Sequence, residues 1–67
     1  MPLLMLTSSH TAAEGAALSL RLEGYQARPG YRHGASFLIV DCPRSDLDVL
    51  VDRIRQADPG SRRVVVW

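Results

Sequence analysis

The sequence predicts a small α/β domain, with an open sheet of four strands and two helices. Two apolar runs, residues 3–6 and 37–40, contain no charged residue and lack the polar alternation of a half-exposed strand. We therefore expect strands that are covered on both faces. Each run is followed within a few residues by a stretch of helical periodicity. The expected elements are, in order, a strand at residues 3–6, a helix at 11–23, a strand at 25–28, a strand at 37–41, a helix at 45–57 and a strand at 63–67.

Length and composition limit how such a domain is stabilised. A chain of 67 residues forms one domain, residues 1–67, and buries only about 60% of its unfolded surface when it folds. Cys42 is the only cysteine and the two histidines lie far apart, so we expect no disulfide, no metal site and no cofactor. Oligomerisation, most simply as a homodimer, is the remaining source of stability.

The charge pattern bears on possible partners. Eight arginines and no lysine stand against seven acids, and Arg62-Arg63 is the only adjacent basic pair. Nucleic-acid binding needs a basic patch, so the sequence disfavours a nucleic-acid partner. The longest apolar runs are too short to span a bilayer, and no basic segment precedes an apolar stretch at the N-terminus. We expect a soluble, cytoplasmic protein without a membrane partner.

The first helix has more apolar surface than packing on a sheet requires. Thr11 and Glu14 have the spacing of a capping box at its start, and Gly24 is placed to end it. Leu18 and Leu22 lie on a second apolar stripe, away from the small residues that suit packing on a sheet. These two leucines either contact a flanking loop or enter a subunit interface.

The link between the second and third strands leaves their relative direction open. Parallel strands need a crossover of a dozen residues or more, and residues 29–35 supply only about seven. Antiparallel strands need only a turn, which His33-Gly34 can form. The continuous apolar runs favour the parallel α/β arrangement, whereas the short link favours the alternative, an α+β ferredoxin-like βαββαβ order. A histidine in such a turn is most simply a solvated side chain.

The second helix is an ordinary amphipathic helix followed by an apolar strand. Ser45 is placed to cap the helix, and the Asp-Pro-Gly sequence of residues 58–60 ends it. The chain then finishes on Trp67. An aromatic residue on a strand that has no covering helix of its own indicates burial against a neighbour. Val64, Val66 and Trp67 therefore join the two leucines of the first helix as interface candidates.

Several of these segments together resemble the first two thirds of a response-regulator receiver domain. Residues 3–6 stand where that family has its first strand, and residues 22–26, Leu-Glu-Gly-Tyr-Gln, are similar to the ending of its first helix. Residues 38–41, Leu-Ile-Val-Asp, look like the strand that delivers the phospho-accepting aspartate. Residues 54–60 and 64–66 resemble the end of the third helix and the fourth strand. The resemblance implies a parallel, flavodoxin-like sheet and a role in bacterial-type two-component signalling.

Asp41 takes the phospho-acceptor position in this resemblance, but the residues that should surround it are missing. Thr7 and Ser8 stand where receivers have the acids that hold Mg²⁺, and the chain has no lysine for the family's conserved lysine position. Phosphoryl transfer needs the metal to offset charge on the phosphoryl oxygens, so we expect Asp41 to be inactive. The resemblance therefore implies a pseudo-receiver: a regulatory protein-interaction module that is not an enzyme and acts as a homo-oligomer, independently of phosphorylation. The alternative is a ferredoxin-like domain that binds a small ligand or has a regulatory role.

Overall fold

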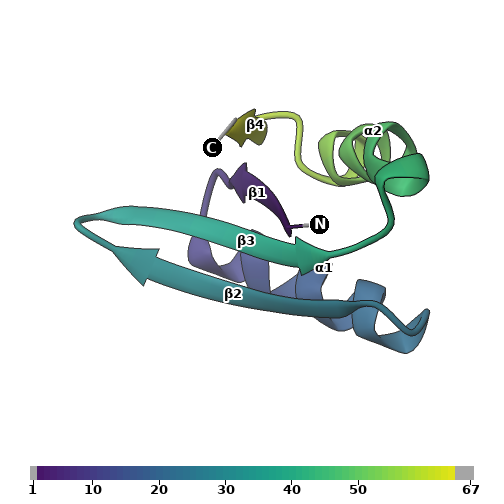
Figure 1. The fold of residues 1–67 in the computed structure, drawn as a ribbon. Coiled ribbons are helices and arrows are strands. Elements are labelled where there is room, and N and C mark those ends of the chain that lie inside the picture. The colour runs from purple at the N-terminus through teal and green to yellow at the C-terminus, as the bar shows by residue number, and fades with distance from the viewer. Residues whose placement is uncertain (1, 65–67) are drawn as a thin grey trace.

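The computed structural model describes residues 2–64, which form four strands, two α-helices and one short 3₁₀ helix (Figure 1). The elements are, in order, β1 (Pro2–Leu6), α1 (His10–Leu22), β2 (Gln26–Arg32), β3 (Ala35–Asp41), the 3₁₀ helix η1 (Arg44–Asp46), α2 (Leu47–Ala57) and β4 (Arg62–Val64). The strands form one sheet in the order β2-β3-β1-β4. The predicted α/β domain with an open four-stranded sheet and two helices is confirmed.

Every neighbouring pair of strands is antiparallel, which corrects the parallel arrangement that the apolar runs favoured. The turn between β2 and β3 accounts for this. His33 and Gly34 have φ angles of 53° and 78°, the positive values that tight two-residue hairpin turns require. The chain therefore folds back at once. Its βαββαβ order and its strand order are those of the ferredoxin-like alternative, and the parallel flavodoxin-like sheet is not formed by the described residues.

Both helices cover the same face of the sheet. Figure 1 shows α1 behind β2 and β3. One set of alternating strand side chains is buried together with residues of both helices, and these residues form the core: Leu3, Met5, Ala17, Leu20, Ala27, Leu38, Val40, Cys42, Leu47, Leu50 and Ile54. The side chains that alternate with them, such as Leu4 and Ile39, point to the other face and are only half-buried. The expectation that residues 3–6 and 37–40 are covered on both faces is therefore wrong.

The two helices begin at different residues from those that the sequence patterns suggested. Ser9 caps α1, because its hydroxyl oxygen accepts a hydrogen bond from the amide of Ala12 at 3.0 Å. Thr11 lies within the first turn, so the capping box predicted there is wrong. Ser45 lies within η1, and the residue that directly precedes α2 is Asp46, whose side chain makes no capping hydrogen bond. The cap predicted at Ser45 is also wrong.

The ends of the elements follow the predictions more closely. Helix α1 ends at Leu22, and Gly24 adopts a φ of 96°, the left-handed conformation expected of a glycine that ends a helix. Strand β2 runs through Pro29 and is longer than predicted. A proline is tolerated there because β2 is an edge strand and does not need every amide for pairing. Val66 and Trp67 lie outside the described residues.

Candidate interaction surfaces

The face of the sheet that the helices leave uncovered carries a contiguous group of apolar side chains. The register places Ile39, Leu4 and Val64 side by side in one row across the strands, and Phe37 beside Leu6 in the next row. All five residues are half-buried. We call this group of five residues the open face. A contiguous apolar surface in contact with solvent is typical of an interaction site.

The ring of Phe37 lies over Gly30 of the neighbouring strand β2. The two residues are direct partners in the register, and a Cβ atom placed on Gly30 would come within 2.2 Å of Phe37 Cε2. Only a residue without a side chain leaves room for the ring in this position. Gly30 thus extends the apolar surface of the open face to the β2 edge of the sheet.

Three arginines frame the open face. The register places Arg28 and Arg32 on its β2 side and Arg62 on its β4 side, and all three are exposed. Asp41 lies at the end of β3 beside Gln26, on the same face and also exposed. Asp41 is the one acidic residue in the described rows of this face. The apolar centre therefore has a mostly basic rim with one carboxylate at one end.

The outer surface of the helix layer carries large apolar side chains of its own. Leu18 and Leu22 of α1 are 60% and 82% exposed, and Val49 of α2 is 66% exposed. Val64, by contrast, belongs to the open face on the other side of the sheet. The described interface candidates Leu18, Leu22 and Val64 thus fall on opposite sides of the molecule, so that a single small interface cannot contain all three.

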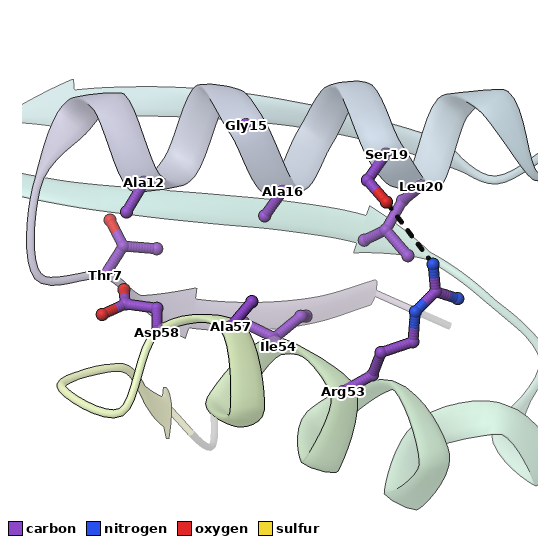
Figure 2. Close-up of a pocket in the computed structure, with 10 residues that line it drawn as sticks. All are labelled: Thr7, Ala12, Gly15, Ala16, Ser19, Leu20, Arg53, Ile54, Ala57 and Asp58. Atoms are coloured by element: carbon purple, nitrogen blue, oxygen red, sulfur yellow. Dashed lines mark hydrogen bonds between the residues drawn. The ribbon is translucent and has the colours of Figure 1, made fainter.

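A groove of about 310 Å³ separates α1 from α2 (Figure 2). Small residues such as Gly15 and Ala16 form its wall on α1, and no atom lies within 4 Å of the point where a Cβ on Gly15 would be. Figure 2 shows polar groups at both ends: Thr7 and Asp58 at one end, with Ser19 and Arg53 at the other. This volume lies at the lower end of the range for small-ligand pockets.

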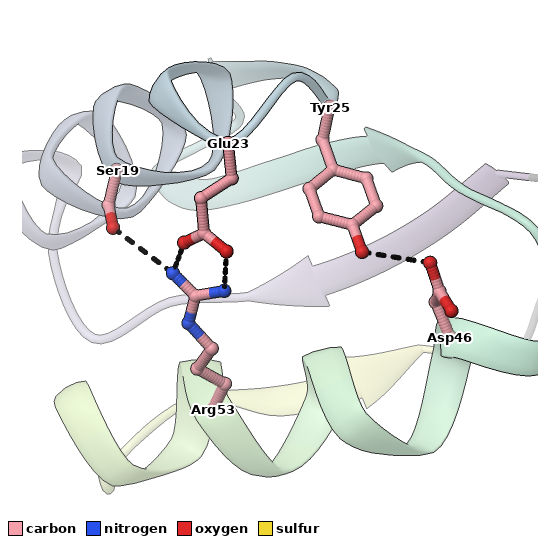
Figure 3. A network of polar contacts seen from close by, with 5 residues as sticks. All are labelled: Ser19, Glu23, Tyr25, Asp46 and Arg53. Atoms are coloured by element: carbon pink, nitrogen blue, oxygen red, sulfur yellow. Dashed lines mark hydrogen bonds and ion pairs between the residues drawn. The ribbon is translucent and has the colours of Figure 1, made fainter.

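Three polar contacts connect α1 and the residues that follow it to η1 and α2 (Figure 3). The guanidinium of Arg53 pairs with the carboxylate of Glu23 and donates a longer hydrogen bond, 3.5 Å, to the hydroxyl of Ser19. The hydroxyl of Tyr25 donates to Asp46 Oδ2 at 2.8 Å. That hydrogen bond, with a smaller contribution from desolvation, raises the pKa of the Tyr25 phenol. These contacts join the two sides of the molecule next to the groove.

Asp58 connects the loop after β1 to the end of α2. Ser8 donates its hydroxyl to Oδ1 at 2.6 Å and its amide to Oδ2 at 2.9 Å. Both hydrogen bonds stabilise the charged carboxylate and lower the pKa of Asp58. The carboxylate of Asp58 is therefore negatively charged at this end of the groove at neutral pH, and the amide and hydroxyl of Ser8 hold it in place.

The antiparallel register keeps Asp41 away from the positions that a receiver would bring to it. Pro2 lies beside Asp41, whereas the amide of Thr7 donates to the carbonyl of Ser36 at 3.0 Å, at the opposite end of β3. The five residues of strand between Thr7 and the level of Asp41 span about 17 Å. Asp41 ends β3 as predicted, but Thr7 and Ser8 lie at the other end of the sheet.

The remaining candidate groups do not converge on a reactive centre. His33 is exposed in the turn at the tip of the β2–β3 hairpin. Cys42 is buried, and that burial raises the pKa of its thiol, which disfavours the reactive thiolate. Within residues 2–64, no group of three or more histidine, cysteine, aspartate or glutamate side chains is arranged to hold a metal ion. Neither α1 nor α2 has the length and apolar content needed to cross a membrane.

Comparison with protein-family models, with curated proteins and with solved structures finds no match for this chain.

Sequence reasoning missed the open face because it assigned Leu4, Leu6, Phe37 and Ile39 to the interior. A signal was present in the order of the elements. In a βαββαβ chain each helix connects two parallel strands that have an antiparallel strand between them, and both connections are right-handed. That handedness places both helices on one face, so the other face has no cover of its own.

Proposed function

We propose that this protein is a non-catalytic regulatory or protein-interaction module that acts as a homo-oligomer through its open face. The observation that carries the proposal is the contiguity of five apolar side chains on the uncovered side of the sheet. Burial of apolar surface stabilises association by about 25 cal/mol per Å² removed from water. A chain of 67 residues has little stability to spare, and a second copy seated on this face would increase it.

The open face supports this role better than the leucines of α1. Leu18 and Leu22 are strongly exposed, but they stand on one ridge of a helix whose adjoining surface is formed by small and polar residues. The open face offers instead two adjacent rows of apolar side chains from three strands. Sheet faces pack against one another with interdigitating side chains, which suits a pair of identical surfaces.

The proposed role is independent of phosphorylation. Asp41 is far from Thr7 and Ser8, and neither of those residues supplies a carboxylate for a metal. Incubation with a small-molecule phosphodonor and Mg²⁺, followed by intact mass measurement, should give no phosphorylated protein. A stoichiometric adduct that is lost in Asp41→Asn would contradict this part of the proposal.

Sedimentation of two matched double variants tests the choice of face. Leu4→Thr/Ile39→Thr removes apolar surface from the open face and keeps good strand formers, whereas Leu18→Gln/Leu22→Gln does the same on α1 with good helix formers. The wild type should dimerise as its concentration rises, the open-face variant should remain monomeric and folded, and the α1 variant should behave as the wild type. A wild type that stays monomeric and fully folded into the millimolar range would overturn the proposal.

A second candidate function is the binding of a small regulatory ligand in the groove between α1 and α2. The volume of the groove and the ionised carboxylate of Asp58 at one end favour it, and they suit a molecule with an aliphatic body and an amine. Titration with short aliphatic amines, followed by amide chemical shifts, should then perturb residues around Ala16. The variant Ala16→Leu, which fills the groove, should abolish the shifts. Amines that leave the spectrum unchanged at millimolar concentration would exclude this candidate.

A further inference from the structure

We infer that two copies of this chain pack open face against open face about a two-fold axis that runs between the sheets, at right angles to the strands. This inference rests on the proposed function and adds to it the geometry of the pair. It follows from the way in which apolar residues, charges and the Phe37 ring are distributed over the rows of the open face.

The rows of the open face determine which residues would meet. A rotation about such an axis keeps each strand opposite the same strand of the other copy but reverses its direction. With the axis placed midway between the two apolar rows, the row of Ile39 and Leu4 meets the row of Phe37 and Leu6. Ile39 then packs on the partner's Phe37, and Leu4 on the partner's Leu6. The apolar residues of β1 and β3 are thus paired with one another, as an isologous interface requires, while Val64 of β4 lies opposite the partner's Arg62.

The charges at the ends of the open face become complementary in this arrangement. The row that contains Asp41 and Gln26 meets the row that contains the partner's Arg32. Asp41 and the partner's Arg32 are then one strand apart, about 4.8 Å in the direction across the sheet, which is within reach of an arginine side chain. The two-fold axis makes this contact twice.

The Phe37 ring supplies a second complementary contact. Because the ring lies over Gly30, the position opposite Arg28 is occupied by the partner's Phe37 ring. A guanidinium placed over an aromatic face is attracted by the electrons of the ring. Arg28 can make this contact from an edge strand while its charge remains close to solvent.

The other simple two-fold axis, parallel to the strands, lacks both contacts. It would place β2 opposite the partner's β4, so that Arg28 meets the partner's Val64 and Asp41 meets the partner's Pro2. Arg32 would then face no acidic residue. Electrostatic complementarity selects between docking geometries that bury similar apolar area, and here it selects the axis at right angles to the strands.

The size of the face sets the expected strength of the pair. Four strands about 4.8 Å apart and four rows about 6.7 Å apart give a face of at most about 500 Å² per copy. This is below the roughly 800 Å² per partner of a standard stable interface. We therefore expect dimerisation in the micromolar range, with rapid exchange between monomer and dimer.

A charge exchange tests the geometry separately from dimerisation itself. Asp41→Arg alone and Arg32→Glu alone should each weaken the dimer by about tenfold, because each variant places like charges together at two symmetric contacts. The double variant Asp41→Arg/Arg32→Glu should restore the dissociation constant to within about threefold of the wild type. The matched control Asp41→Arg/Arg62→Glu has the same net charge and should not be restored. Sedimentation equilibrium measures the dissociation constants of the wild type and of these four variants, with circular dichroism to confirm that each variant is folded.

The outcomes distinguish this inference from the proposed function. A dimer that is lost in Leu4→Thr/Ile39→Thr but shows no restoration in the double charge exchange would overturn the geometry and leave the proposed function standing. A wild type that remains monomeric would overturn both. A basic rim and an aromatic ring would also suit single-stranded nucleic acid as the molecule bound to the open face. Titration of the protein into a fluorescent single-stranded oligonucleotide tests this alternative. Binding that is lost in Phe37→Ala and that competes with dimerisation would assign the face to nucleic acid and overturn the inference.

Discussion

The two faces of the sheet are built from the same strands and both have apolar side chains at their centre, yet they differ in what covers them. In β3, Leu38 is completely buried under the helices, while its neighbour Ile39 on the other face is only half-buried. In β1 the same contrast separates Met5 from Leu4. Apolar character therefore reports that a strand face is suited to burial, but not which partner buries it. The helices of the same chain bury one face, and the other face is the basis of the proposed function.

The largest expected effect is on stability, and it should differ between two adjacent residues of β3 that lie on opposite faces of the sheet. Leu38→Ala should reduce the free energy of unfolding by about 2–5 kcal/mol, because it leaves a cavity between the sheet and the helices. In a domain of this size that loss is enough to unfold much of the population. Ile39→Ala should cost the dilute monomer much less, because solvent already reaches this side chain. Denaturant unfolding at protein concentrations below the dimerisation range measures the loss of stability in both variants. Equal losses would show that the open face is as well covered as the core.

The local elements of the fold were predictable because they depend on short patterns. The apolar runs gave both central strands, Gly24 gave the end of α1, and the turn at His33-Gly34 was recognised as a possible hairpin. The strand direction was predicted wrongly because two patterns disagreed. The continuous apolar runs favoured a parallel sheet covered on both faces, whereas the short link favoured a hairpin turn between antiparallel strands. The steric requirement of the turn prevailed, since a chain that reverses within two residues cannot also cross over to a parallel strand.

The neighbours on the open face and along its rim were not predictable from sequence, because they depend on register. Arg28, Arg32 and Arg62 are scattered along the chain and form no basic run, yet the strand pairing brings them to one rim. Phe37 and Gly30 are seven positions apart in the sequence and become direct neighbours only through the hairpin. A shift of one residue in any of these pairings would reverse the face to which the side chains point.

The next effect concerns the stability changes caused by substituting two glycines, one on the sheet and one on helix α1. Gly30→Ala should displace the Phe37 ring from the sheet, because the new methyl group would occupy the position of the ring. We expect a loss of about 1–3 kcal/mol in stability together with weaker dimerisation. Gly15→Ala places its methyl group in open space on α1 and should stabilise the helix by about 0.5–1 kcal/mol. Thermal unfolding with a concentration series measures both. Stabilisation by Gly30→Ala would show that the ring does not rest on the glycine.

A smaller effect concerns the helix side, where Asp58 holds the loop after β1. Asp58→Asn should cost about 1 kcal/mol, since the hydrogen bonds from Ser8 lose their charged acceptor. The pKa of Asp58 is lower in the folded state than in the unfolded chain, so its contribution to stability is fully present above about pH 5 and is lost as the pH falls through the folded pKa. Urea unfolding at several pH values measures this. The difference between wild type and Asp58→Asn should shrink as the solution is acidified, and a constant difference would contradict the assignment.

The smallest expected effect lies at the surface of the helix layer, where Arg53 bridges α2 and the end of α1. Its side chain is 39% exposed and that of Glu23 is 45% exposed, so water and salt screen the pair. A double-mutant cycle with Arg53→Gln and Glu23→Gln should give a coupling energy of about 0.2–1 kcal/mol that falls as salt is added. A larger coupling that resists salt would mean that the pair is held rigidly across the groove and that the separation of the helices is fixed by it. In that case the groove, like the core and unlike the open face, would be a feature that the chain stabilises by itself.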